Sequence, residues 1–283
     1  MPKPRTGRRI LHRTSTDVRS EAAARVECDG VPINVVRVLE EDPELGASLD
    51  DAELAIAAQH LVAAEIRVPK GLWEVEHPLG QSRADLGFLV LDGLLVRETV
   101  IGRHTTAELL GSGDLLRPWD QNEDAPDAPV LTEHAYRVLQ PTRVAVLDAR
   151  FATLCSRLPS VTAELLSRTL RRSRLLGLLL ALSSMPRLYA RLLALLWHLA
   201  DRWGKVGPNG VHVPLRLTHA TLAKLVGAQR PSVTSALQAL EGRGLVSRIP
   251  EGGGWLLLGD PPGDPEKALA EDERAARFAR TPH

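Results

Sequence analysis

The feature of the sequence that most restricts its fold lies between residues 211 and 259, where two short helices are predicted around a glycine turn. Thr218 is a favourable N-cap for a first helix that would end at Gly227. A second helix can open at Arg230 and end at Gly242, because the proline that follows Arg230 is tolerated in a first helical turn. The spacing leaves only a tight turn between the two helices.

Strands are predicted on both sides of this pair of helices. Val211–Leu217 would precede it, and Leu245–Ile249 and Trp255–Leu258 would follow it around a glycine-rich turn. A helix, a tight turn, a second helix and a β-hairpin make a winged helix-turn-helix. Packing of the two apolar helix faces leaves polar residues of the second helix on its outward side or at its start, namely Gln229, Arg230, Ser232, Thr234 and Ser235.

The start of the second helix carries chemistry that suits double-stranded DNA. Free N–H groups and the helix dipole present partial positive charge to a phosphate. Arg230 can reach guanine O6 and N7 in the major groove, and Gln229 can pair with adenine. A helical hairpin with a β-ribbon that contacts another protein is the alternative interpretation.

The distribution of charge agrees with one polyanion-binding region. The chain of 283 residues has 35 Lys and Arg against 35 Asp and Glu. Residues 41–135 hold 19 acidic and 6 basic residues, whereas residues 184–260 hold 9 basic and 4 acidic ones. Such a split favours a polyanion-binding domain beside one that does not bind polyanions.

The N-terminal half has the pattern of a small β domain. Residues 1–28 are basic and aperiodic, which predicts a flexible tail, and residues 29–150 predict an antiparallel barrel or double-sheet roll. The expected strands are Val31–Val38, Leu61–Val68, Leu86–Val90, Leu94–Val96, Ala135–Leu139 and Arg143–Leu147.

Turns and one helix are expected within this β domain. Asp92-Gly93 is a hairpin signal, and Gly111–Asp114 is a second turn. Asp50 and Glu53 fit a capping box for a helix over Asp50–Ala64. The acidic, proline-containing stretch Asp120–Pro129 predicts a mobile surface loop.

Residues 151–183 predict a long helix with apolar residues at three- and four-residue steps. Arginines occupy the remaining face, so the helix either packs within its own chain or pairs with the same helix of a second chain. A further helix, with Ser184 as its cap, would open the domain of residues 184–260, and residues 261–283 would form a C-terminal tail.

Leu217 to Ile249, LTHATLAKLVGAQRPSVTSALQALEGRGLVSRI, resembles the DNA-binding domain of the cyclic AMP receptor protein and fumarate–nitrate regulator (CRP/FNR) family. The order of parts supports the resemblance over about 230 residues. It implies an α+β fold: an antiparallel β-roll like a cyclic-nucleotide-binding jelly roll, a long dimerisation helix and a winged helix-turn-helix. It also implies a cytoplasmic, homodimeric transcription regulator that is no enzyme, binds double-stranded DNA and, if it is an activator, contacts RNA polymerase.

The resemblance also implies roles for single residues. Thr218 and Ser232 would contact backbone phosphates, Arg230 would read a base with Gln229 beside it, and Arg248 would reach a phosphate from the wing. In this chain Pro231 stands where the family usually has an acidic residue, and Thr234 and Ser235 stand where it has a second base-reading arginine. A preferred DNA sequence different from the best-known one is therefore expected.

The cofactor motifs of the family are degenerate in this chain. Gly113 and Asp114 match the turn before the cyclic-nucleotide cassette, but the Gly-Glu pair and the downstream arginine motif are missing. Arg117 is the only cation in this stretch, and one arginine is a poor phosphate cradle. Cys28 and Cys155 are too few for an iron–sulfur cluster. No cofactor or metal is predicted, and the effector is unassigned.

Other classes of protein are disfavoured by what the sequence lacks. No apolar run approaches the roughly 20 residues of a membrane span. Two cysteines cannot form a disulfide framework, which suits a reducing cytoplasm. A metal-dependent, cupin-like enzyme is a rival interpretation of the β domain, but closely spaced histidine pairs are missing from it.

Overall fold

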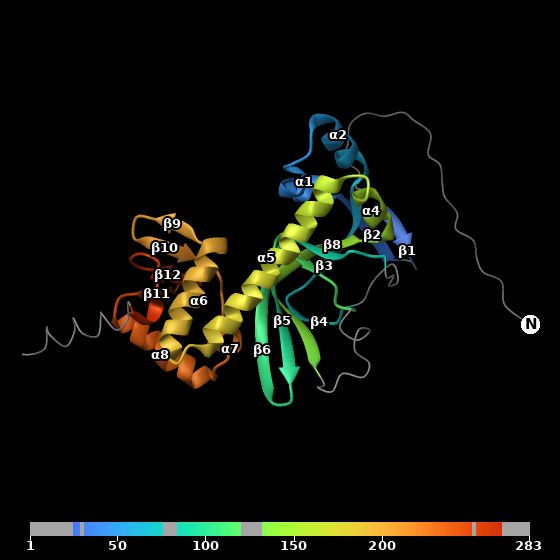
Figure 1. Ribbon diagram of the computed structural model, residues 1–283. Helices are drawn as coiled ribbons and strands as arrows, with labels where there is room; N and C mark the ends of the chain where they lie inside the picture. The colour runs from blue at the N-terminus through green and yellow to red at the C-terminus, as the bar shows by residue number, and fades with distance from the viewer. Residues whose placement is uncertain (1–24, 29–30, 76–83, 120–131, 251–252, 268–283) are drawn as a thin grey trace, which may run out of the picture.

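The computed structural model describes residues 25–28, 31–75, 84–119, 132–250 and 253–267 (Figure 1). An antiparallel β-roll lies on one side and a smaller helical domain on the other, and helix α5 (Pro159–Ser184) runs between them. The predicted α+β fold is confirmed. The predicted loop over Asp120–Pro129 and most of both predicted tails fall outside the described residues.

The described strands of the roll form one antiparallel sheet in the order β1-β2-β3-β8-β5-β6, with β4 paired to β8 and β7 to β5. Arg25–Cys28, predicted to belong to the tail, forms strand β1. The other strands are β2 (Val31–Arg37), β3 (Val62–Val68), β4 (Gly71–Trp73), β5 (Gly87–Ile101), β6 (His104–Gly111), β7 (Leu115–Leu116) and β8 (Glu133–Leu147).

The hairpin predicted at Asp92-Gly93 is wrong. Strand β5 continues through these residues, and its pairing with β8 shifts register on both sides of Asp92, which is the mark of a β-bulge. Gly93 has φ of +102°, and a Cβ there would lie 2.6 Å from the Pro141 carbonyl oxygen. Glycine therefore serves a close approach of two strands here, and the chain reverses only after Ile101.

Three short helices cover one end of the roll: α1 (Val38–Glu41), the 3₁₀ helix η1 (Pro43–Gly46) and α2 (Asp51–His60). The predicted capping box of Asp50 and Glu53 is confirmed. The helix ends at His60, not at Ala64, because residues from Val62 onward pair with β2.

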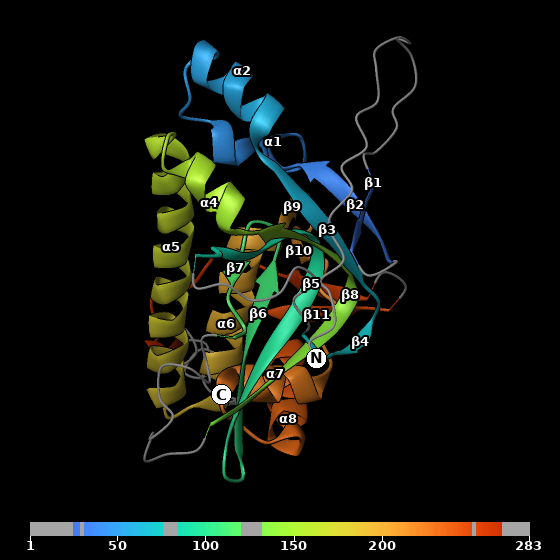
Figure 2. The same ribbon diagram turned by 90° about the vertical axis from the view of Figure 1, so that its right-hand side faces the viewer.

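Two helices lead out of the roll, and a third follows them. Helix α4 (Ala149–Cys155) precedes α5, which passes beside the roll (Figure 2), and α6 spans Leu188–Trp203. Ser184, predicted to cap the next helix, is instead the last residue of α5, where its hydroxyl donates to the Ala181 carbonyl. Arg187 occupies the N-cap position of α6.

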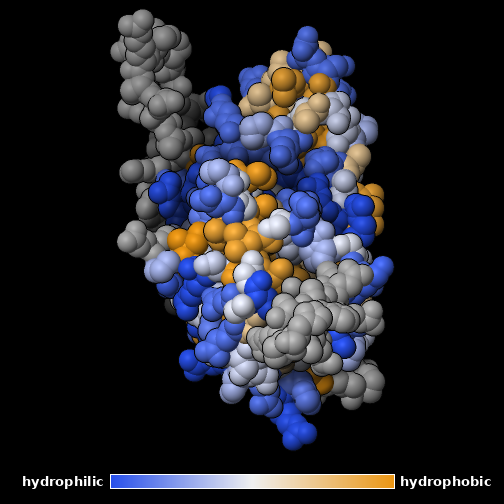
Figure 3. All heavy atoms as spheres, turned by 90° about the vertical axis from the view of Figure 1, so that its left-hand side faces the viewer, coloured by the Kyte–Doolittle hydropathy of each residue, from blue (hydrophilic) through white to orange (hydrophobic). Residues whose placement is uncertain are grey.

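The C-terminal domain combines α6 with two further helices and a four-stranded sheet of order β11-β12-β10-β9. Seen from its side, its surface is largely hydrophilic, with hydrophobic side chains gathered near the middle (Figure 3). The elements are β9 (Lys205–Gly207), β10 (Gly210–Val213), α7 (His219–Val226), α8 (Arg230–Gly242), β11 (Val246–Ile249) and β12 (Gly254–Leu257).

The buried core of the C-terminal domain extends onto the roll. Leu94, Val96 and Leu109 of the roll belong to the same buried cluster as Leu192 of α6 and Leu222 of α7. The two halves of the chain therefore meet in an apolar contact, while the rest of the roll packs around two further buried clusters. Among the described helices, none has the length and apolar character needed to cross a membrane.

Candidate DNA-binding site

Helices α7 and α8 form the predicted helix-turn-helix. The Thr218 hydroxyl accepts a hydrogen bond from the Thr221 amide at 3.1 Å, which confirms Thr218 as the cap of α7. Gly227 ends the helix in the left-handed region at φ of +65°, where glycine adopts a conformation that costs other residues energy. Leu222, Leu225, Val233 and the other apolar residues of the pair are buried in one cluster, as the spacing predicts.

The start of α8 is open to solvent. Gln229 is the N-cap residue and makes no capping bond with its side chain, and the proline after Arg230 occupies the first turn. Gln229, Arg230, Ser232 and Ser235 are exposed, whereas Thr234 is half-buried. Arg230 and Arg248 form no ion pair with any residue that the structure describes, so both guanidinium groups are available to an external anion.

Two of the predicted contact residues also bond within α8. The Thr234 hydroxyl donates to the Arg230 carbonyl at 3.1 Å, and the Ser235 hydroxyl donates to the Pro231 carbonyl at 3.3 Å. Each oxygen retains lone pairs that can accept a bond from a base amino group.

A cleft of about 670 Å³ separates the start of α8 from the wing formed by β11 and β12. Thr218, Arg230 and Arg248 line it, so three predicted contact residues from distant parts of the sequence meet there. Arg216 and His219 also line the cleft, and the sequence analysis missed both. Both lie close to Thr218 in sequence, but only the packing of the wing beside this segment brings them into the cleft.

Groups that can bind phosphate are therefore concentrated around one cavity. We call this cavity, with its lining residues, the wing cleft. Its charged members among the described residues are Arg216, Arg230 and Arg248, with no carboxylate. The positive end of the α8 dipole opens beside it. Such a surface can hold the backbone of a nucleic acid while the exposed face of α8 reaches base edges.

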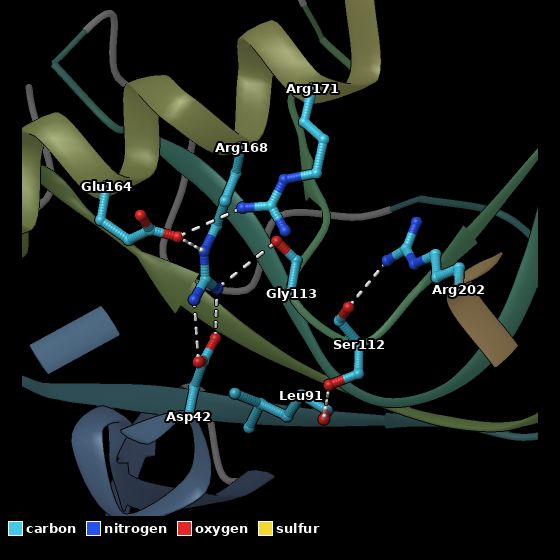
Figure 4. Close-up of polar contacts among 8 residues, drawn as sticks. All are labelled: Asp42, Leu91, Ser112, Gly113, Glu164, Arg168, Arg171 and Arg202. Carbon is cyan, nitrogen blue, oxygen red and sulfur yellow. Dashed lines mark hydrogen bonds and ion pairs between the residues drawn. The ribbon is translucent and has the colours of Figure 1, made fainter. Parts of the chain in front are cut away.

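The cofactor candidates lie at a different place, the turn over Gly111–Asp114. The Asp114 carboxylate accepts from the Gly111 amide at 2.8 Å and pairs with Arg202 of α6 at 2.9 Å. The Gly113 carbonyl lies 3.5 Å from Arg168 of α5, and the Ser112 carbonyl accepts from Arg202 at 2.8 Å (Figure 4).

Arg117 lies near an aromatic ring, with its guanidinium carbon 5.9 Å from the centre of the Trp119 ring. Cys155 is buried under α5, and burial raises the pKa of its thiol to about 11, which keeps the sulfur protonated.

Residues 190–263 match the family model of the Crp-like helix-turn-helix domain. This part of the chain is similar in sequence to Crp-like helix-turn-helix domains. The match includes every predicted DNA-contacting residue, from Thr218 to Arg248. It agrees with the resemblance that the sequence shows over Leu217–Ile249.

Solved structures share the fold over most of the chain. A mutant of CooA from Carboxydothermus hydrogenoformans is similar at TM-score 0.56 and 17% identity, covering 82% of this chain and 94% of that one. A cyclic nucleotide-binding domain containing protein from Listeria monocytogenes is similar at TM-score 0.56 and 16% identity, covering 80% and 98%. FixK2 from Bradyrhizobium japonicum is similar at TM-score 0.51 and 16% identity, covering 69% and 92%. No curated protein matches the sequence.

Proposed function

We propose that this protein is a cytoplasmic, sequence-specific transcription regulator that binds a palindromic operator as a homodimer. The observation that carries the proposal is the open, cationic start of α8 beside the wing cleft of a Crp-like domain. In a symmetric dimer, two such helices would enter successive major grooves about 34 Å apart. Gln229, Arg230 and Ser235 would select bases, while Thr218, Ser232 and Arg248 would hold phosphates.

An apolar stripe along α5 supports the dimer. Leu166, Leu170 and Leu180 are 58%, 53% and 73% exposed, although leucine is a residue type that is usually buried. Their spacings of four and ten residues place them on one side of the helix, with Ser173 and Gly177 between them. The same stripe of a second copy is its natural partner, because such a pairing removes all of these side chains from water.

The effector stays unassigned in this proposal. Gly113, Asp114 and Arg117 remain the candidates for a ligand in the roll, and a cyclic nucleotide remains to be tested. A ligand there would act on the turn that contacts both α5 and α6, and so would rotate the C-terminal domain about residues 183–187. If the protein is an activator, RNA polymerase is the further partner.

The central experiment selects bound fragments from random genomic DNA with the purified protein, with and without cyclic nucleotides. On the selected duplex, Arg230→Ala is expected to weaken binding by about 1–3 kcal/mol, because a bidentate base contact is lost. Arg157→Ala serves as the matched control, since Arg157 is exposed in the segment between α4 and α5, away from α8. Equal affinities of the two variants would refute the assignment.

Salt dependence separates this function from its rivals. Release of counterions from DNA makes the logarithm of the binding constant fall steeply and linearly with the logarithm of salt concentration. A protein-binding module would show no such dependence on duplex DNA. A stoichiometric metal in the purified protein would point instead to the cupin-like enzyme.

A further inference from the structure

His219, the first residue of α7, ties the two helices of the helix-turn-helix together. Its Nδ1 lies 2.9 Å from the Thr234 hydroxyl oxygen, and that hydroxyl donates to the Arg230 carbonyl at 3.1 Å. The imidazole also lies beside the Trp255 indole of the wing, with ring centroids 6.4 Å apart. The side chain is therefore held between α7, α8 and β12, and it lines the wing cleft.

The Thr234 hydroxyl lies within hydrogen-bonding distance of both the Arg230 carbonyl oxygen and His219 Nδ1, and its single hydrogen can serve only one of them. When the hydroxyl donates to the carbonyl, its oxygen accepts a bond from Nδ1–H, and the neutral imidazole then has its lone pair on Nε2. A proton taken up by this tautomer binds at Nε2.

The surroundings of the ring favour an anion as the partner of a protonated Nε2. The charged groups that line the cleft with His219 are Arg216 from the segment before α7, Arg230 from α8 and Arg248 from β11, and no described lining residue is a carboxylate. Among the described lining residues, the protonated ring therefore has no negative partner. A DNA phosphate would supply that charge, and an opposite charge within about 4–6 Å favours the charged form of an imidazole.

We propose that His219 makes DNA binding dependent on pH, by taking up a proton at Nε2 that it then donates as an N–H bond to a backbone phosphate. The inference rests on the proposed function, because DNA brings the phosphate. Binding that takes up a proton becomes tighter as the pH falls, by at most about tenfold per pH unit for each subunit. Histidine is suited to the role because it changes charge between about pH 5 and pH 8.

The test measures fluorescence anisotropy of a labelled duplex selected by the wild-type protein, at about pH 6 and about pH 8 and constant ionic strength. We expect the wild type to bind about three- to tenfold more tightly per subunit at the lower pH. His219→Asn can keep the bond to Thr234 through its amide N–H but does not titrate, so its affinity should match that of the wild type at the higher pH and stay flat. His104→Asn, at an exposed position on the β5–β6 hairpin, should retain the wild-type pH dependence.

Each outcome bears on one claim. The same pH dependence in the wild type and in His219→Asn would overturn the role of His219 while leaving DNA binding intact. An equal loss of affinity at both pH values would show a positioning role alone and would also overturn it. Failure of the wild type to bind any duplex at either pH would instead remove the proposed function. His219→Gln, checked for its fold by circular dichroism, repeats the test should the first variant not fold.

Discussion

Arginines have opposite roles at two places in this molecule. In the roll, Arg168 of α5 is buried and forms a bidentate pair with Asp42, and Arg172 pairs with Glu108 at 2.6 Å. At the start of α8 and on the wing, Arg230 and Arg248 are exposed and form no ion pair within the described part of the chain. Arginine side chains therefore bind a helix to the roll at the first place and are available to an external anion at the second.

This difference in burial and pairing shows that an arginine in a sequence can have either a structural or a ligand-binding role. Burial lowers the pKa of Arg168, but hydrogen bonds and the charges of Asp42 and Glu164 raise it above its usual value, so the group stays charged in the interior. The hydrogen-bond donors of Arg168 are thus used by partners inside the protein. An exposed arginine at a helix start retains its bidentate capacity for a base or a phosphate.

The largest effect is expected from Arg168→Met, which should lower the free energy of unfolding by about 3–5 kcal/mol. The substitution leaves the Asp42 carboxylate, only 9% exposed, without its charged partner. Urea denaturation followed by circular dichroism measures the change. Arg230→Ala in the same assay should stay within about 0.5 kcal/mol of the wild type, because it removes no buried contact.

Arg171→Met is the matched control on the same helix. Arg171 is exposed and, among the described residues, pairs only with Glu164, at 3.4 Å, so its loss should cost less than about 1 kcal/mol. If Arg168→Met were no more destabilising than Arg171→Met, the contrast between buried, paired arginines and exposed ones would not hold.

A smaller effect is expected from Thr218→Ala, which removes the cap of α7. Loss of the bond from the Thr221 amide should lower the free energy of unfolding by about 1 kcal/mol and should also weaken DNA binding if Thr218 holds a phosphate. Thr218→Ser keeps the hydroxyl and should restore both quantities. A loss of stability without a loss of affinity would confine Thr218 to its structural role.

The smallest effect concerns an ion pair that links the two halves. Lys224 of α7 lies 2.6 Å from Glu98 of β5, and because the lysine is partly exposed, the coupling should be below about 1 kcal/mol. A double-mutant cycle with Lys224→Met and Glu98→Gln measures it by denaturation. A coupling several times larger would mean that this pair contributes more than the apolar contact to holding the C-terminal domain against the roll.

Local signals predicted helices α7 and α8 well because each of their boundaries rests on a single residue type, whereas Ser184 was wrong as the cap of α6. The Thr218 cap, the Gly227 turn and the proline after Arg230 act within one helical turn, so they can be recognised without tertiary information. The hairpin prediction at Asp92-Gly93 was wrong because a bulge and a hairpin turn both use glycine. Only the approach of Pro141 from another strand distinguishes the two.

The parts of the site that escaped prediction depend on contacts between distant segments. Arg216 and His219 become members of the wing cleft only when β11 and β12 fold beside them. The same holds for the partners of α5, since Asp42 and Arg168 are 126 residues apart in sequence. Such pairings follow from the register of strands and helices, and no local pattern encodes them.

The apolar contact between the roll and the C-terminal domain limits how this protein can be divided or set in motion. A fragment that begins at α6 would expose to water the leucine-rich surface that Leu94, Val96 and Leu109 cover in the intact chain. Such a fragment should be prone to aggregate. A movement of α8 relative to the roll would have to slide along this contact or expose it to water, so the contact determines how rigidly the two domains are joined.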